Sequence, residues 1–191
     1  MKLLHGVLEH NESFVENKEY LKYATTKFPD KKVVVLSCMD TRLVELLPKA
    51  LNFKHGDMKI VKNAGALVSH PFGSIMRSIL VAVYELNADE VMVIGHHDCG
   101  MGSVNADSMI EKMKERGIKK EKIDALKYAG IDVKGFLKGF QSVQESVKES
   151  VEAINNHPLL PPKIPVHGLV IDPHTGKLDV IVNGYDEDYY L

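Results

Sequence analysis

Hydrophobic residues cluster along this chain in short runs that alternate with amphipathic stretches. The run Val33–Ser37 is continuous and mostly β-branched, which is typical of a strand buried on both faces of a sheet. Glu90–Gly95 is a second such run, and Met58–Asn63 is a shorter one. Helical patterns lie between these runs, over residues 43–51 and 72–87. This alternation predicts an α/β fold with a mostly parallel central β-sheet flanked by helices.

A long helical pattern precedes the first strand. Residues 3–28 place apolar residues among charges, with an expected break at residues 11–13 and an end at Pro29. Such a helix can lie on the surface of its own chain, or it can form an arm that packs on a second copy. The pattern alone leaves both interpretations open.

The second half of the chain continues the alternation. Val143, Val147 and Val151 recur at helical spacing, and residues 166–171 and 178–183 have the pattern of two further strands. No repeat, low-complexity tract or obvious linker interrupts the sequence, and its 191 residues are within the usual length of one domain. We therefore expect a single domain.

Composition and charge exclude several classes of protein. The formal net charge is −2, whereas a surface that follows nucleic-acid phosphates is usually strongly basic. No segment approaches the roughly 18 apolar residues of a membrane span, and the N-terminus lacks the apolar region of a signal peptide. We expect a cytoplasmic protein with no nucleic-acid or membrane partner. Thiols stay reduced in that compartment, so a disulfide is the less favoured use of the two cysteines.

Each cysteine lies just beyond one of the two buried runs. Cys38 directly follows the first, and Cys99 follows the second within His96-His97-Asp98-Cys99. Because ligands bind at the carboxyl ends of strands in open α/β sheets, the two thiols are placed where chemistry is expected. His96 and Cys99 can bind one metal ion from a single turn, and Cys38 would complete a Cys₂His set. Three protein ligands and an open position are typical of catalytic zinc, whereas Mg²⁺ and Ca²⁺ prefer oxygen.

Other interpretations of these residues are weaker. A His-x-x-Cys pair alone is a weak signal, and a buried inert cysteine beside a hydrogen-bonded histidine is its alternative. The sequence lacks a phosphate-binding Gly-x-x-x-x-Gly-Lys-Ser/Thr loop and a redox Cys-x-x-Cys pair. The spacing from Cys38 to Arg42 is too short for the Cys-x₅-Arg loop of cysteine phosphatases.

Asp40 and Arg42 extend the expected site. If strand geometry continues past Cys38, all three side chains share one face, because side chains alternate with period 2. A surface ion pair, which contributes little, is the alternative. Beside a metal ion, Arg42 can hold Asp40 bidentately and ionised, so that Asp40 accepts a hydrogen bond from metal-bound water. Asp40 could also enter as a fourth ligand, which Arg42 would oppose.

At these residues the chain resembles the β-class carbonic anhydrases, and in particular their short prokaryotic members. The resemblance covers nearly the whole chain. It is carried by Cys38-Met39-Asp40-Thr41-Arg42, Asn63-Ala64-Gly65, Gly95-His96-His97-Asp98-Cys99-Gly100 and Val166-His167-Gly168-Leu169.

The resemblance implies an enzyme that reversibly hydrates CO₂ to bicarbonate and a proton. One Zn²⁺ per subunit would be held by Cys38, His96 and Cys99, with Asp40 and Arg42 as the catalytic dyad. It also implies one domain over residues 1–191 and a homodimer, with a tetramer as a further assembly. In such a dimer residues 1–29 would form an N-terminal helical arm that packs on the partner.

Further expectations concern the surroundings of the metal. Asn63, Ala64, Gly65 and Gly100 are expected to support the substrate site. His97 is expected either to relay protons, since imidazole titrates near neutrality, or to be structural. Hydrolysis of COS or CS₂ at the same zinc and a non-catalytic structural zinc protein remain alternatives to carbonic anhydrase activity.

Overall fold

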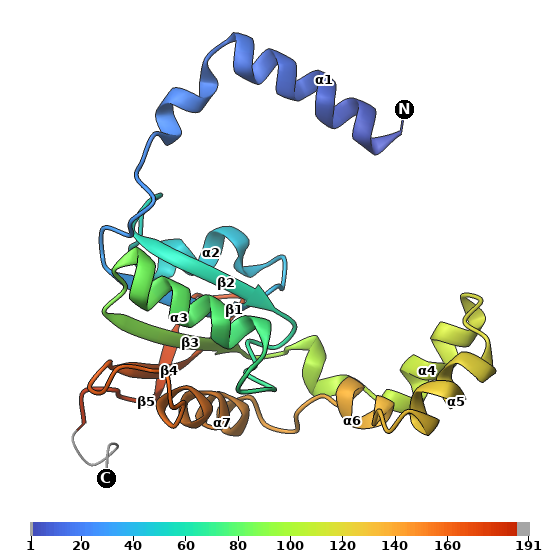
Figure 1. Cartoon of the computed structure of the whole chain (residues 1–191). Coiled ribbons are helices and arrows are strands. Elements are labelled where there is room, and N and C mark those ends of the chain that lie inside the picture. The colour runs from blue at the N-terminus through green and yellow to red at the C-terminus, as the bar shows by residue number, and fades with distance from the viewer. Residues whose placement is uncertain (1, 187–191) are drawn as a thin grey trace.

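A five-stranded sheet with the order β2-β1-β3-β4-β5 forms the centre of the molecule (Figure 1). The computed structural model describes residues 2–186. The first four strands along the chain pair in parallel, and only β5 runs antiparallel, to β4. The predicted mostly parallel sheet is therefore confirmed. The strands are β1 (Val33–Cys38), β2 (Met58–Asn63), β3 (Glu90–His96), β4 (Val166–Ile171) and β5 (Leu178–Val182).

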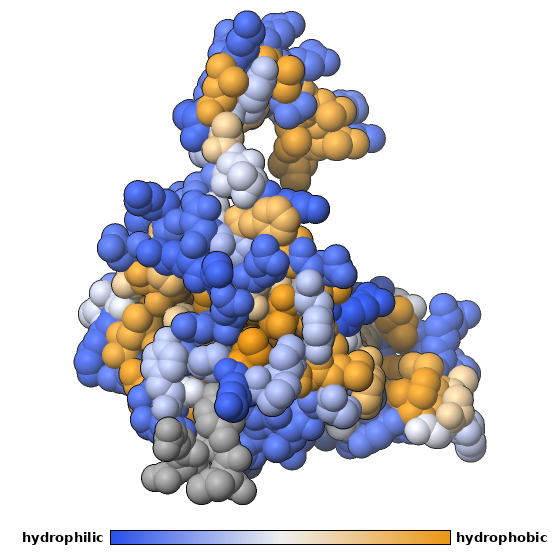
Figure 2. Space-filling view, turned by 60° about the vertical axis from the view of Figure 1, so that its left-hand side comes forward, coloured by the Kyte–Doolittle hydropathy of each residue, from blue (hydrophilic) through white to orange (hydrophobic). Residues whose placement is uncertain are grey.

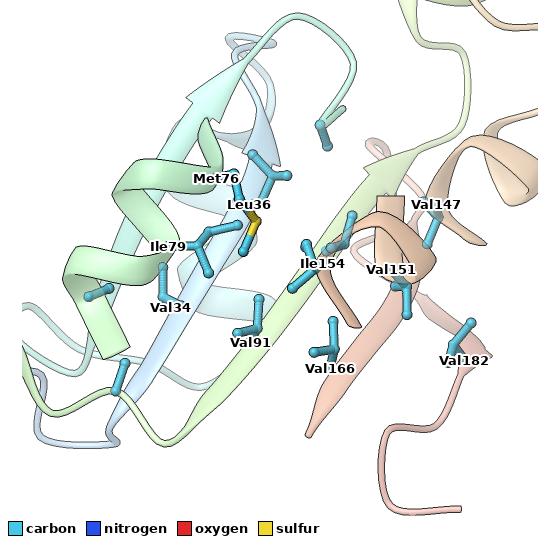
Figure 3. Packing of buried hydrophobic residues seen from close by; sticks show 14 of the residues in the cluster. Val34, Leu36, Met76, Ile79, Val91, Val147, Val151, Ile154, Val166 and Val182 are labelled. Carbon is cyan, nitrogen blue, oxygen red and sulfur yellow. The ribbon is translucent and has the colours of Figure 1, made fainter. Parts of the chain in front are cut away.

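Helices cover both faces of this sheet. On one face α3 (Ser74–Leu86) packs over Val34 and Leu36 of β1, and α7 (Val143–Asn155) packs over β3 and β4 (Figure 3). On the other face α2 (Leu43–Ala50) packs over alternate residues of the same strand. Because β1 contributes to both cores, all six of its residues are buried, which explains its continuous apolar run.

Three short helices form a separate bundle between β3 and α7. Its own small core contains Ile110, Ile123, Val133 and Leu137. In Figure 1 this bundle projects from one end of the sheet. Its helices are α4 (Ala106–Glu115), α5 (Lys120–Tyr128) and α6 (Val133–Leu137), preceded by the 3₁₀ helix η2 (Gly100–Ser103).

The N-terminal helix stands away from the sheet. Helix α1 (Leu3–Glu16) has no buried residue and is followed by the 3₁₀ helix η1 (Glu19–Tyr23). The expected break at residues 11–13 is wrong, because the chain turns only at Lys18, which has a φ of 55°. Asparagine, glutamate and serine each lower helix stability by less than about 0.7 kcal/mol, which is too little to end a helix. Apolar side chains are visible along this arm in Figure 2.

No helix within residues 2–186 is both long and apolar enough to cross a membrane.

Two glycines allow α7 to lie directly on the sheet. A Cβ atom at Gly95 would approach Val143 Cγ2 to 2.7 Å, and one at Gly168 would approach Val147 Cγ1 to 2.7 Å. Both distances are shorter than real side chains adopt. The glycines of β3 and β4 therefore set how closely α7 covers these strands, and β3 carries one of the candidate ligands.

We predict that Gly168→Ala lowers the free energy of unfolding by about 1–3 kcal/mol, because the added methyl group overpacks a close-packed contact. Chemical denaturation measures this change. Gly102→Ala is a matched control, since its Cβ would meet only the Phe140 ring at an ordinary 3.5 Å. Equal stability of the two variants would contradict this account of the α7 contact.

Candidate metal centre

The candidate ligands lie at the carboxyl edge of two neighbouring strands. β1 and β3 pair in parallel, so Cys38 and His96, their last residues, end at the same edge. Cys99 follows His96 by one turn, and its Sγ lies 3.9 Å from Cys38 Sγ. The ligand atoms of all three residues lie within 4.8 Å of one another. The structure thus brings together the predicted set, although Cys38 and His96 belong to the strands rather than following them.

His96 presents one nitrogen to the two thiols. Its Nδ1 donates a hydrogen bond to the carbonyl of His97 at 2.8 Å, which fixes the orientation of the ring. Its Nε2 is buried and has no hydrogen-bond partner among the described residues. A buried polar atom without a partner destabilises the fold. A metal ion bound to this nitrogen would remove that destabilisation.

The two thiols differ in acidity. Burial alone would raise the pKa of Cys38, but contact with His96 and a hydrogen bond from the Gly65 N–H at 3.3 Å lower this pKa to about 7. Burial and the neighbouring Cys38 raise the pKa of Cys99 to about 11. Cys38 is therefore the thiol that ionises first, and a cation between the two sulfurs would favour ionisation of both.

A tight turn, rather than a continued strand, brings Asp40 and Arg42 to the site. β1 ends at Cys38, so the expected alternation over positions 38, 40 and 42 is wrong. Instead, the backbone N–H of Arg42 donates to Asp40 Oδ1 at 2.9 Å, and its guanidinium Nε and Nη2 donate to Oδ1 and Oδ2 at 3.0 and 2.9 Å. The side chain of an aspartate bonding two residues ahead is typical turn chemistry.

This pairing keeps Asp40 ionised and close to the ligands. The Arg42 guanidinium lowers the pKa of the Asp40 carboxyl group to about 2. Asp40 Oδ2 lies 3.8 Å from His96 Nε2. The carboxylate is thus fixed beside the group of three ligand atoms without being one of them.

Asp98 also contacts this pair, and sequence reasoning did not assign it a role. Arg42 Nη1 donates to Asp98 Oδ2 and Arg42 Nη2 donates to the Asp98 carbonyl, both at 2.9 Å. The two residues are 56 positions apart, so no local pattern links them. The available signal was the place of Asp98 between two candidate ligands.

The loop after β2 lies beside the candidate ligands. The Asn63 side chain accepts a hydrogen bond from the Leu67 N–H at 3.0 Å and donates one to the Leu67 carbonyl at 2.7 Å, which closes the loop. Gly65 has a φ of 88°, a left-handed conformation that favours glycine, and it turns its N–H toward Cys38. Ala64 and Gly100 line a cavity of about 330 Å³ beside the ligands. Its other lining residues are Cys38, Met39, Asp40, Thr41, Cys99 and Met101.

His97 lies apart from this cavity. Its side chain is 40% exposed, and its Nε2 lies 3.7 Å from Asp179 Oδ2 on β5. The residues that line the cavity do not include it. A proton-relay role for His97 stays a prediction.

Fold and site together define the class: a mostly parallel α/β sheet with a Cys-His-Cys group at its carboxyl edge that could hold one metal ion. The sequence profile of the carbonic anhydrase family matches residues 33–178. The chain belongs to the β-carbonic anhydrase family.

Individual relatives agree with this family. The chain is 66% identical to "Putative carbonic anhydrase YtiB" of Bacillus subtilis (strain 168) over 97% of its own length and 100% of that protein. It is 62% identical to "Putative carbonic anhydrase YvdA" of the same bacterium, over 98% and 95%. A crystal structure of β-carbonic anhydrase isoform I from Trichomonas vaginalis superposes with a TM-score of 0.88 at 35% identity, covering 97% of this chain and 100% of that one. A more distant relative is a carbon disulfide hydrolase of Acidithiobacillus thiooxidans, 29% identical over 78% of this chain and 76% of that protein.

We predict that Cys38→Ser, His96→Ala and Cys99→Ser each abolish metal retention, because each removes one of three ligands. Elemental analysis of purified, dialysed protein measures the metal content per chain. Asp40→Asn is the matched control, since it alters a polar residue of the same site outside the ligand group. Full metal content in any of the first three variants would refute that ligand.

Proposed function

We propose that this protein is a zinc-dependent carbonic anhydrase that reversibly hydrates CO₂ to bicarbonate and a proton. The observation that carries this proposal is the Cys38, His96 and Cys99 group beside a carboxylate held by an arginine. Two sulfurs and one imidazole nitrogen suit Zn²⁺ better than an oxygen-preferring ion. A tetrahedral ion with Zn–S bonds of about 2.3 Å separates its sulfurs by about 3.8 Å. The 3.9 Å between the two thiols fits this requirement.

Cys38, His96 and Cys99 would hold one Zn²⁺ per subunit. When bound, zinc supplies a nucleophile for CO₂ by lowering the pKa of water. Two thiolates and a neutral imidazole carry a charge of −2, which cancels that of a divalent ion. Such a neutral site favours hydroxide less than a tris-histidine site does, so the surrounding residues have more to contribute.

Asp40 has the properties of the residue that orients the attacking group. Its carboxylate is ionised at neutral pH and is fixed by three hydrogen bonds from Arg42. It can therefore accept a hydrogen bond in one defined direction, without the cost of reorganising during the reaction. Held by Arg42, it is also kept from entering as a ligand.

The cavity beside the ligands suits a small neutral substrate. Ala64, Met39 and Met101 contribute apolar surface to its lining, and the Gly100 backbone is open there, because a Cβ at Gly100 would meet nothing within 4 Å. CO₂ carries no net charge and needs no counter-ion. Apolar walls and backbone would position it for attack.

We predict that Asp40→Asn retains zinc but loses at least about 100-fold in kcat/KM, because the amide donates where a carboxylate accepts. Stopped-flow measurement of CO₂ hydration across a pH range, with zinc content measured in parallel, tests this. Asp89→Asn, at an exposed ion pair with Lys32, is the control. Turnover near the wild-type value in Asp40→Asn would refute the role of the dyad, and absence of hydration by the zinc-loaded wild-type protein would refute the proposed function.

Hydrolysis of COS or CS₂ is the second candidate activity. COS and CS₂ are linear, neutral molecules like CO₂, so the same cavity and the same residues could act on them. The similarity to a carbon disulfide hydrolase is the observation that favours this candidate. Parallel assays with CO₂, COS and CS₂ on one preparation distinguish the candidates. A purely structural zinc site is less favoured, because such sites usually close with four protein ligands.

The subunit would act as a homodimer through its N-terminal arm. Helix α1 buries none of its residues on its own chain, although several of them are apolar. Each of four apolar side chains is more than half exposed: Leu3, Leu4, Val7 and Leu8. An apolar helix face without a partner is typical of an interaction site. A second copy that covers this face accounts for it, and a tetramer would need further contacts.

Two free thiols in use as ligands also fit a reducing location such as the cytoplasm.

We predict that the wild-type protein is a dimer and that the double variant Leu4→Glu/Leu8→Glu weakens it more than about 100-fold. Each leucine contributes about 1.5–3 kcal/mol when buried, and the two lie one turn apart on the same helix face. Sedimentation equilibrium measures the change. Ser13→Glu, on the opposite side of α1, is the control. A monomeric wild-type protein, or an unchanged dimer in the double variant, would refute the role of the arm.

A further inference from the structure

Arg42 joins the two turns that carry the candidate ligands. Four hydrogen bonds leave its guanidinium: Nε and Nη2 bond the Asp40 carboxylate, while Nη1 and Nη2 bond Asp98. Asp40 belongs to the turn after β1, with Cys38. Asp98 belongs to the turn after β3, between His96 and Cys99. One side chain therefore spans both halves of the site.

The bonds of Arg42 to Asp40 and to Asp98 restrict different movements. Asp40 lies two residues before Arg42 on the same turn, so their bonds fix the pair internally. Those bonds leave the pair free to move as a unit relative to the turn after β3. The bonds to Asp98 connect the pair to that other turn, and they limit this movement.

The backbone at Asp98 is adapted to this contact. Its φ of 52° lies in the left-handed region, which aspartate and asparagine tolerate better than most residues do. Both its carboxylate and its carbonyl then accept hydrogen bonds from the same guanidinium. The substitution Asp98→Asn would retain the conformation and a side-chain acceptor oxygen, whereas Asp98→Ala would retain only the backbone carbonyl.

We propose that Asp98 is a positioning residue that fixes the Asp40–Arg42 pair relative to His96 and Cys99. This inference rests on the proposed function and deepens it, because it names what places the dyad at the metal site. Asp40 Oδ2 lies only 3.8 Å from His96 Nε2, so a small displacement of the pair would change how Asp40 faces the ligands. Asp98 sets that approach through Arg42 and does not itself line the cavity.

Solvent limits the size of the effect. The Asp98 side chain is 78% exposed and that of Arg42 is 32% exposed, so their ion pair is screened by water. Loss of the Asp98 carboxylate should therefore lower kcat/KM about fivefold, far less than loss of Asp40 itself. The Asp98→Ala variant keeps the backbone carbonyl at this position, which continues to hold Nη2.

Nitrogen-15 NMR of the arginine side chains tests the positioning directly. The chain contains only Arg42, Arg77 and Arg116, so three sets of side-chain signals need assignment. In the wild-type holoenzyme we expect separate, slowly exchanging Nη1 and Nη2 signals for Arg42. In Asp98→Ala, rotation of the Nη1 group should speed up about tenfold. Asp98→Asn should restore slow rotation and wild-type kcat/KM to within twofold.

A matched control and parallel kinetics complete the experiment. Asp107→Ala removes a similarly exposed carboxylate that pairs with Lys134 in the separate helical bundle, and it should leave the Arg42 signals and kcat/KM unchanged. Arg42 signals that are the same in Asp98→Ala and wild type would overturn the proposal. So would kcat/KM unchanged in Asp98→Ala, or an equal effect of Asp107→Ala. If Arg42 responds as expected while the wild-type protein hydrates no CO₂, the proposed function fails and the structural bridge stands.

Discussion

The parallel pairing of β1 with β3 is the interaction on which the site depends. The register runs from Val33 opposite Glu90 to Ser37 opposite Ile94, so both strands reach the same edge. Cys38 and His96 are buried at that edge by the sheet itself. A slip of one residue in this register would turn every side chain of one strand to the opposite face. The burial of β1 in two separate cores makes such a slip costly.

Around this frame, polar groups are matched locally and with few exceptions. Arg42 donates hydrogen bonds to both Asp40 and Asp98, and the Gly65 N–H donates to the thiol of Cys38. His96 Nε2 is the buried exception at the centre, where the two sulfurs converge. A metal ion bound between this nitrogen and the two sulfurs would give His96 Nε2 the partner that it lacks. The Asp40–Arg42 pair is close to the ligands because the turns after β1 and β3 hold the pair beside the ligand residues.

Much of this arrangement could be predicted from the sequence, for physical reasons. Continuous β-branched runs identify strands buried on both faces, so β1 and β3 were located to within one residue of their ends. The three ligand residues followed, since they stand where such strands end. The path of the chain after Cys38 could not be derived from alternation, because a turn whose aspartate bonds the backbone replaces the strand. The role of Asp98 depends on a contact across 56 positions, which only the pairing of two strands creates.

The N-terminal helix also shows what the local sequence pattern can and cannot predict. Its helical pattern was evident, but its polar residues at 11–13 interrupt the pattern without interrupting the helix. Whether such a helix packs on its own chain depends on tertiary contacts, and α1 makes no burying contact there. Local pattern therefore locates the elements well, whereas the partner of each element is decided by the rest of the molecule.

A crystal structure of the zinc-loaded protein at atomic resolution tests the central claim most directly. The account predicts one zinc ion per chain, bound by Cys38, His96 and Cys99, with the Asp40 carboxylate on Arg42 and the fourth position open to solvent or substrate. Zinc bound elsewhere, or Asp40 bound to the metal at every pH with its bonds to Arg42 broken, would contradict it.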